Sequence, residues 1–188
     1  LLALLAAWHL ELSVLPFSEK APLASVDLAL DQLPWTMRLY KGNKEKSAIN
    51  PKSPRLSIIV ERNPQGATAT GSQVFIMTSG STGIPKGIGH SLDGLAASAR
   101  ATLDFYQWQQ RDSWLLSLDP SHIGGLQILM RVWLGRGLCV YGGEPKDVAG
   151  ALKGRVCQYL SLVPTQLLRL LESPDTERSL RQAKAILL

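Results

Sequence analysis

The feature that most constrains the fold of this chain is a regular alternation of short apolar runs with helical patterns over its second half. From about Ser91 to Tyr106, apolar residues recur three or four positions apart, which predicts a helix that Ser91 is suited to cap. Further on, strands predicted at 114–118, 137–141, 156–163 and 185–188 alternate with helices predicted at 125–134, 145–152 and 164–171. Such short spacing predicts an α/β fold with a mostly parallel sheet flanked by helices, which binds ligands at the carboxyl ends of its strands.

The first part of the chain is less regular. Residues 1–12 predict a buried helix rather than a signal peptide, because they lack a basic region, carry His9 and Glu11, and are too short to cross a bilayer. Strands are predicted at 13–17, 56–60 and 73–77, and a loop at 63–72.

A loop rich in hydroxyl groups and glycines follows the strand predicted at 73–77 and reads Thr78-Ser-Gly-Ser-Thr-Gly-Ile-Pro-Lys-Gly87. The amides of Gly80 and Gly83 can approach an anion closely, because no Cβ stands in the way. Hydroxyl groups at Ser79, Ser81 and Thr82 and the mobile charge of Lys86 complete a cradle for nucleotide phosphates. We therefore expect ATP-dependent chemistry. The loop is not of the Walker type, which needs adjacent glycine and lysine and opens a helix that Pro85 would disturb.

Composition excludes several other classes of function. The 188 residues carry a net charge of +5 with a pI near 9.4, which suits anionic ligands but is too scattered for a nucleic-acid site. No stretch predicts a membrane span. The two cysteines, Cys139 and Cys157, lie in apolar runs without zinc-binding spacing, so we predict no protein metal ligands and a reducing, cytoplasmic location.

The ten residues 78–87 resemble the signature loop of the adenylate-forming superfamily of AMP-binding enzymes, which includes acyl-CoA synthetases, and match it at every fixed position. Two later segments, Trp114-Leu-Leu-Ser-Leu-Asp-Pro-Ser-His-Ile-Gly-Gly125 and 161–171, resemble further motifs of that superfamily. Together with Arg131, they are most similar to the o-succinylbenzoate–CoA ligases of menaquinone biosynthesis. The resemblance divides the chain into an upstream α/β segment, 1–72, and a phosphate-loop and acyl-pocket segment, 73–188.

This resemblance implies an ATP-dependent acid–thiol ligase that forms a carbon–sulfur bond. An acyl-adenylate and pyrophosphate would form first, with Mg²⁺ on the nucleotide, and the acyl group would then pass to CoA as co-substrate with release of AMP. The substrate would be o-succinylbenzoate; alternatives are another acyl-CoA synthetase, an adenylation domain, or a non-catalytic nucleotide-binding module. The chain would be part of the large N-terminal domain, without the C-terminal domain, and we expect it to be inactive alone. A homo-oligomer is left open.

The resemblance also assigns roles to individual residues. Thr78 joins Ser79, Gly80, Ser81, Thr82, Gly83 and Lys86 in binding the β- and γ-phosphates of ATP, although Thr78 could instead cap the end of its strand. His122, counted with Lys86 among the catalytic candidates, would line the acyl pocket with Gly124 and Gly125. Arg131 would bind a substrate carboxylate in bidentate fashion; the alternatives are a surface arginine with a buried stem or a structural ion pair.

Overall fold

The computed structural model describes residues 14–16, 37–41, 58–62, 73–78, 86–142, 147–153 and 155–188. Eight strands lie in these ranges: β1 (Met37–Lys41), β2 (Ile58–Arg62), β3 (Gln73–Thr78), β4 (Lys86–Ser91), β5 (Ser113–Leu115), β6 (Leu138–Val140), β7 (Tyr159–Ser161) and β8 (Ala185–Leu187). The helices described there are α3 (Leu92–Phe105), α4 (Ile123–Leu134), α5 (Val148–Leu152), α6 (Pro164–Leu171) and α7 (Pro174–Arg181). The helix predicted at 1–12 and the loop predicted at 63–72 fall outside the described residues.

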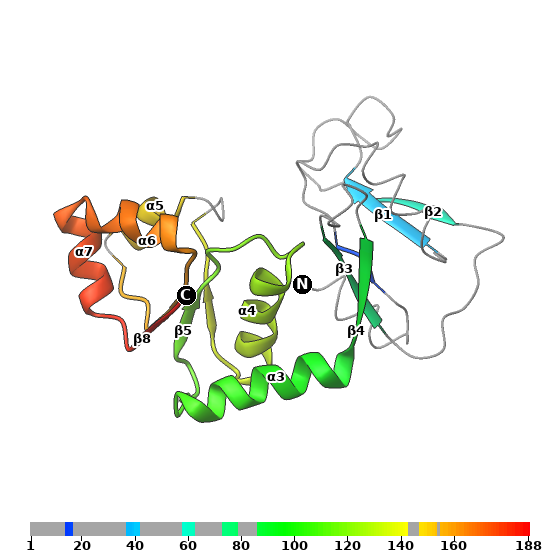
Figure 1. The fold of residues 1–188 in the computed structure, drawn as a ribbon, viewed down its shortest axis with the longest axis horizontal. Coiled ribbons are helices and arrows are strands. Elements are labelled where there is room, and N and C mark those ends of the chain that lie inside the picture. The colour runs from blue at the N-terminus through cyan, green and yellow to red at the C-terminus, as the bar shows by residue number, and fades with distance from the viewer. Residues whose placement is uncertain are drawn as a thin grey trace, which may run out of the picture.

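A four-stranded parallel sheet of order β6-β5-β7-β8 organises the second half of the chain. Helices α3 and α4 cover one face and α5, α6 and α7 cover the other (Figure 1). Because side chains alternate along a strand, Trp114 and Tyr159 pack towards α3 and α4, while Leu115 and Leu160 pack towards α5, α6 and α7. The predicted α/β fold with a mostly parallel, helix-flanked sheet is confirmed.

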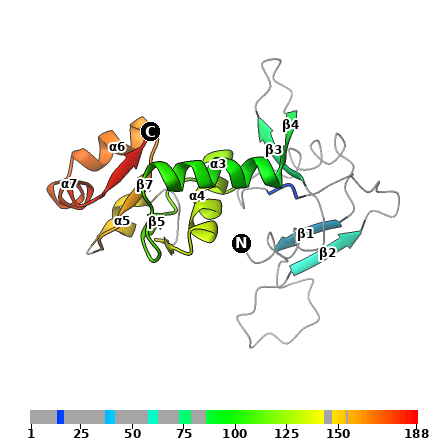
Figure 2. The same ribbon diagram turned by 90° about the horizontal axis from the view of Figure 1, so that it is seen from below.

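Helix α3 links this sheet to the earlier strands, and in both views it runs from the β3–β4 hairpin to the parallel sheet (Figures 1 and 2). Its buried residues follow the predicted three-and-four spacing: Leu95, Ala96, Ala99 and Leu103. The hydroxyl of Ser91 accepts a hydrogen bond from the amide of Gly94 at 3.1 Å, so the predicted N-cap is confirmed.

Two smaller antiparallel pairs were not predicted as pairs. β3 pairs with β4 from Gln73 opposite Ser91 to Thr78 opposite Lys86, and β1 pairs with β2. The strand predicted at 73–77 is confirmed, and that at 56–60 is observed two residues later, at 58–62. Of the strand predicted at 13–17, Val14 forms a single parallel bridge to Val74. Strands β1 and β4 and helix α7 were missed.

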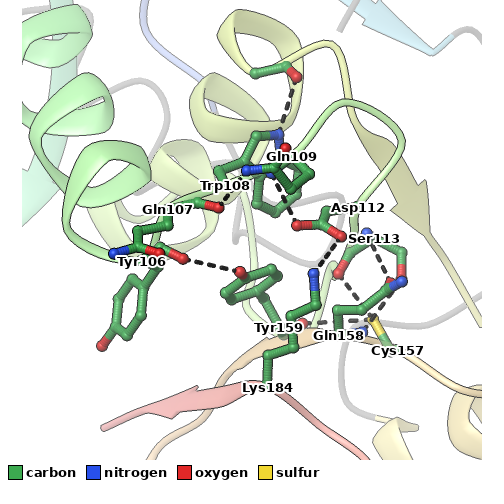
Figure 3. A network of polar contacts seen from close by, with 11 residues as sticks. Tyr106, Gln107, Trp108, Gln109, Asp112, Ser113, Cys157, Gln158, Tyr159 and Lys184 are labelled. Atoms are coloured by element: carbon green, nitrogen blue, oxygen red, sulfur yellow. Dashed lines mark hydrogen bonds and ion pairs between the residues drawn. The ribbon is translucent and has the colours of Figure 1, made fainter.

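A polar network closes the amino ends of the parallel strands (Figure 3). The ammonium group of Lys184 lies 2.7 Å from a carboxylate oxygen of Asp112, which is 5% exposed. The other oxygen of Asp112 accepts from the amide of Gln109 at 3.0 Å, and the hydroxyl of Tyr159 donates to the carbonyl of Tyr106 at 3.2 Å. These contacts join the loop before β5 to β7 and β8. In the part of the chain that the structure describes, no helix has the length and apolar character needed to cross a membrane.

Candidate functional site

The loop end of the β3–β4 hairpin carries the two described residues that were predicted to bind phosphate, Thr78 and Lys86. Thr78 and Lys86 face each other in the strand register, and both are exposed. One face of β3 packs in the core, because Val74 is completely buried and Ile76 is 3% exposed. Ser79, Gly80, Ser81, Thr82 and Gly83 lie outside the described residues. The fold thus holds both ends of the loop on a packed hairpin and leaves the ammonium group of Lys86 accessible.

The hydroxyl of Thr78 donates a hydrogen bond to the carbonyl of Lys86 at 3.3 Å. In this arrangement the proton of Thr78 closes the end of the hairpin, as in the alternative role of a cap at the strand end. The hydroxyl would have to rotate to donate to a phosphate.

The loop after β5 brings His122 to the start of α4. His122 is the N-cap residue and is exposed; its side chain makes no capping hydrogen bond, and its amide donates to the carbonyl of Asp119 at 3.0 Å. A side-chain oxygen of Asp119 also accepts from the amide of Ser121 at 2.9 Å, which makes a compact turn. In Figure 1 the start of β4 and the loop leading into α4 both lie above α3. Because His122 is exposed, its imidazole is accessible from the solvent.

Gly124 and Gly125 let this loop pack closely on α4. A Cβ on Gly125 would overlap the carbonyl group of Asp119 and lie 2.6 Å from the carbonyl oxygen of Leu118, and a Cβ on Gly124 would lie 2.9 Å from the Leu118 side chain. Gly125 is buried and Gly124 is half-buried. Close packing against backbone therefore accounts for Gly125, whereas the Leu118 side chain could shift to admit a Cβ at position 124. The predicted contact of both glycines with substrate stays a prediction.

A side chain that was not singled out from the sequence fixes the neighbouring strand ends. The side-chain nitrogen Nε2 of Gln166 donates to the carbonyl of Ser117 at 3.0 Å. Its side-chain oxygen accepts from the backbone amide of Val163 at 3.0 Å. The hydroxyl of Ser117 donates to the carbonyl of Ser161. The carboxyl ends of β5 and β7 are thereby tied to the start of α6. A glutamine three residues after a helix N-cap is a sequence signal for the hydrogen bond with the Val163 amide, but not for the one with Ser117.

Arg131 is half-buried, and its side chain lies against the parallel sheet. Its guanidinium carbon is 4.9 Å from the centre of the Trp114 ring, and Trp114 is completely buried. The Nε atom is buried without a hydrogen-bond partner, and Arg131 takes part in no ion pair among the described residues. Burial lowers the pKa of Arg131, although the neighbouring Tyr106 acts in the opposite direction. A half-buried side chain with a buried Nε fits the alternative of an arginine with a buried stem, whereas a structural ion pair of Arg131 is absent among the described residues.

His122 and Arg131 stand well apart on the same helix. Arg131 follows His122 by nine positions, which corresponds to about 14 Å along a helix axis. The side chain of Arg131 shortens this gap, because helical side chains lean towards the amino end of their helix. One ligand could contact both only if it is elongated.

A pocket of about 270 Å³ lies at the carboxyl ends of helices α3 and α4. Its lining residues are Arg100, Leu103, Asp104, Trp108, Gln110, Leu134 and Gly135. It lies at the loops that enter β5 and β6, on the amino side of the sheet, whereas ligands of open parallel sheets bind at the carboxyl side. We therefore leave it out of the candidate site.

Comparison with known proteins identifies the family. Residues 6–187 match the model of the family described as AMP-binding enzyme. The chain is 33% identical over 190 residues to a 2-succinylbenzoate--CoA ligase of Escherichia coli and 32% identical over 192 residues to one of Salmonella typhimurium. In both cases 100% of this chain aligns with 40% of the relative, so the chain spans about two fifths of their length.

Solved structures agree with these relatives. An arginine-to-lysine variant of Escherichia coli MenE with bound OSB-AMS matches with a TM-score of 0.68 and 30% identity, over 98% of this chain and 40% of that one. ATP-bound MatB from Rhodopseudomonas palustris matches with a TM-score of 0.51 and 29% identity, over 60% of this chain and 23% of that one. The family match extends over almost the whole sequence, and this chain therefore belongs to the AMP-binding enzyme family.

Proposed function

We propose that the protein containing this chain is an ATP-dependent acid–thiol ligase that converts o-succinylbenzoate and CoA to o-succinylbenzoyl-CoA, with AMP and pyrophosphate as products. The relatives named as 2-succinylbenzoate--CoA ligases support this activity, as does the MenE structure with bound OSB-AMS. The chain would supply the phosphate loop and part of the acyl pocket.

The observation that carries the proposal is the partly buried guanidinium of Arg131, which has no ion-pair partner among the described residues. Even partial burial of a cation is costly unless an anion compensates it, and no carboxylate of the described residues does so. A dicarboxylate substrate would supply that anion: one carboxylate would bind Arg131 and the other would attack the α-phosphorus of ATP. A carboxylate is ionised at neutral pH, so His122 would line the pocket without having to act as a base.

Lys86 would serve the adenylation step. Its exposed position at the end of the hairpin suits a cation that follows the charge of the triphosphate as pyrophosphate leaves. ATP-bound MatB, a structural relative over 60% of this chain, supports ATP as the nucleotide. Mg²⁺ would accompany the triphosphate and neutralise part of its charge. CoA as acyl acceptor and a cytoplasmic location complete the proposal.

Substitution of Lys86 by alanine tests the assignment. Carboxylate-dependent exchange between ATP and pyrophosphate, measured on the complete protein, should fall by about 100-fold or more, because preorganised charge stabilises the transition state. Lys153, which is exposed on the far face of the parallel sheet, provides a matched Lys→Ala control. Exchange that is unchanged by K86A would contradict the role of the loop.

A second candidate, another acyl-CoA synthetase, is favoured by the partial match to MatB. A screen of carboxylates in the same exchange assay separates the two. Preference for a monocarboxylate over o-succinylbenzoate would support the second candidate, because it would leave Arg131 without its anion.

A further inference from the structure

We propose that Gln127 is a positioning residue for Arg131. Its side-chain carbonyl would accept the Nε–H of Arg131 and so direct the two terminal amino groups of the guanidinium towards a substrate carboxylate. The inference rests on the proposed function, in which Arg131 binds that carboxylate.

The observation behind it is a complementary pair of unsatisfied atoms. Among the described residues, two buried side-chain polar atoms lack a hydrogen-bond partner: Oε1 of Gln127 and Nε of Arg131. The first can only accept and the second can only donate. Buried polar groups are rarely left unpaired, because their lost hydration is not replaced. Each atom is the partner that the other lacks.

The helix places the two side chains where they can meet. Gln127 and Arg131 are four residues apart on α4, so their Cβ atoms lie on one face about 5–6 Å apart. The side chain of Arg131 leans towards the amino end of α4, which is the direction of Gln127. A change in the torsions of the Arg131 side chain is then enough to form the hydrogen bond with Gln127.

Packing against α3 fixes the orientation of the Gln127 amide. Its nitrogen donates to the carbonyl of Leu95 at 3.2 Å, and the residue is only 6% exposed. With the amide reversed, two carbonyl oxygens would face each other, so Oε1 points away from the Leu95 carbonyl. The acceptor is therefore held in place by a neighbouring helix, as a positioning group requires.

The guanidinium of Arg131 would then be held on two sides. Trp114 covers one face of the group, and Gln127 would occupy the Nε–H at one of its edges. The remaining N–H donors could bind a carboxylate in bidentate geometry. Without Gln127, Arg131 would keep its charge but lose its alignment.

A double-mutant cycle of Gln127→Leu and Arg131→Lys tests this arrangement in the complete protein. Leucine keeps the approximate volume of glutamine but removes the acceptor. We expect Q127L to raise the KM for o-succinylbenzoate by about tenfold or more, with the KM for ATP nearly unchanged, because hydrogen bonds to charged groups contribute at least that factor. In the R131K background, Q127L should add little, since the partner of the acceptor is already gone.

Met130→Leu is the matched control, because Met130 is buried in the same helix and packs against α3. It should leave both KM values unchanged. Equal and independent losses from Q127L and R131K would overturn the role of Gln127, whereas a wild-type protein that does not use o-succinylbenzoate would instead contradict the proposed function.

A measurement on the free protein decides the contact without any substrate. The Nε–H of Arg131, assigned in ¹⁵N NMR spectra by its disappearance in R131K, should exchange slowly with solvent in the wild type and in M130L. It should exchange faster, with a shifted resonance, in Q127L. An Nε–H resonance that Q127L leaves unaltered would overturn the inference even if the enzyme is active.

Discussion

At the scale of single residues, the segment from Asp119 to Arg131 combines tight packing with binding chemistry. Gly125 is fixed by packing, because its Cα lies against the backbone of Leu118 and Asp119. Arg131 is explained by binding chemistry, because its half-buried guanidinium stacks on Trp114 and has no ion pair with a carboxylate of the described residues. A substitution at the first residue should act on stability and loop position, and one at the second on substrate affinity.

Gly125→Ala should reduce the free energy of unfolding by about 1–3 kcal/mol, the usual cost of forcing atoms into a filled site. The added methyl group would overlap the carbonyl of Asp119, which is backbone and cannot swing aside. Gly94→Ala is a suitable comparison, because its Cβ would meet only the Ser91 hydroxyl at 3.0 Å. Urea unfolding followed by fluorescence measures both variants, and equal stability of G125A and wild type would refute the argument.

At the scale of elements, the sequence predicted the helices and strands that carry an apolar period and missed those that do not. Helix α3 shows its buried stripe in the sequence, whereas the strand Lys86–Ser91 contains two glycines and leaves Ile88 45% exposed. Helix α7 is mostly polar and buries only Thr176 and Leu180. In such elements tertiary pairing, rather than local pattern, selects the structure.

The candidate site was predictable to a similar extent. The distinctive sequence of the 78–87 loop indicated Lys86 as a functional residue. Arg131 was indicated by being a charged residue in an otherwise apolar helix. Gln127 and Gln166 were missed, because the importance of a glutamine depends on which buried atoms surround it. Leu95 is 32 residues from Gln127 and Ser117 is 49 residues from Gln166, so no local pattern records these contacts.

Ser91→Ala should loosen the junction between β4 and α3. The Ser91 hydroxyl satisfies the amide of Gly94, and losing such a cap costs about 1 kcal/mol. We expect faster hydrogen exchange at the first turn of α3 and, through the paired strands, at β3 and β4. Helix α6, which begins without an N-cap hydroxyl, should exchange as before and serves as the internal control. Ser91→Asp should restore protection, and unchanged exchange in S91A would show that the cap does not hold this junction.

At the scale of the whole described structure, the two ends of the parallel sheet have different tasks. The carboxyl side carries His122 and the turn that supports it, while the amino side is closed by the network around Asp112. Lys184, just before β8, reaches Asp112, just before β5, across 72 residues of sequence. This contact ties the last described strand to the centre of the sheet, so its protonation state should affect the stability of the fold.

Stability should therefore decline at alkaline pH. The hydrogen bond to Asp112 raises the pKa of Lys184, and burial of its hydroxyl raises the pKa of Tyr159. A group whose pKa is raised by folding stabilises the folded state below its unfolded pKa and loses that contribution as the pH rises through its folded pKa. Both contributions should thus be complete at pH 8 and diminish above about pH 10.

Lys184→Met isolates the lysine contribution. The variant should melt at a lower temperature than the wild type at pH 8, and the difference in Tm should shrink as the pH rises above about 10, because the wild-type lysine then loses its charge. Added salt should shrink the difference as well, since the side chain of Lys184 is 48% exposed and its charge is screened. Lys153→Met, at an exposed lysine that directly follows α5, controls for the loss of a positive charge. A Tm difference between K184M and wild type that stays constant from pH 8 to 11 would mean that the lysine contributes through packing of its stem over Tyr159 rather than through its charge.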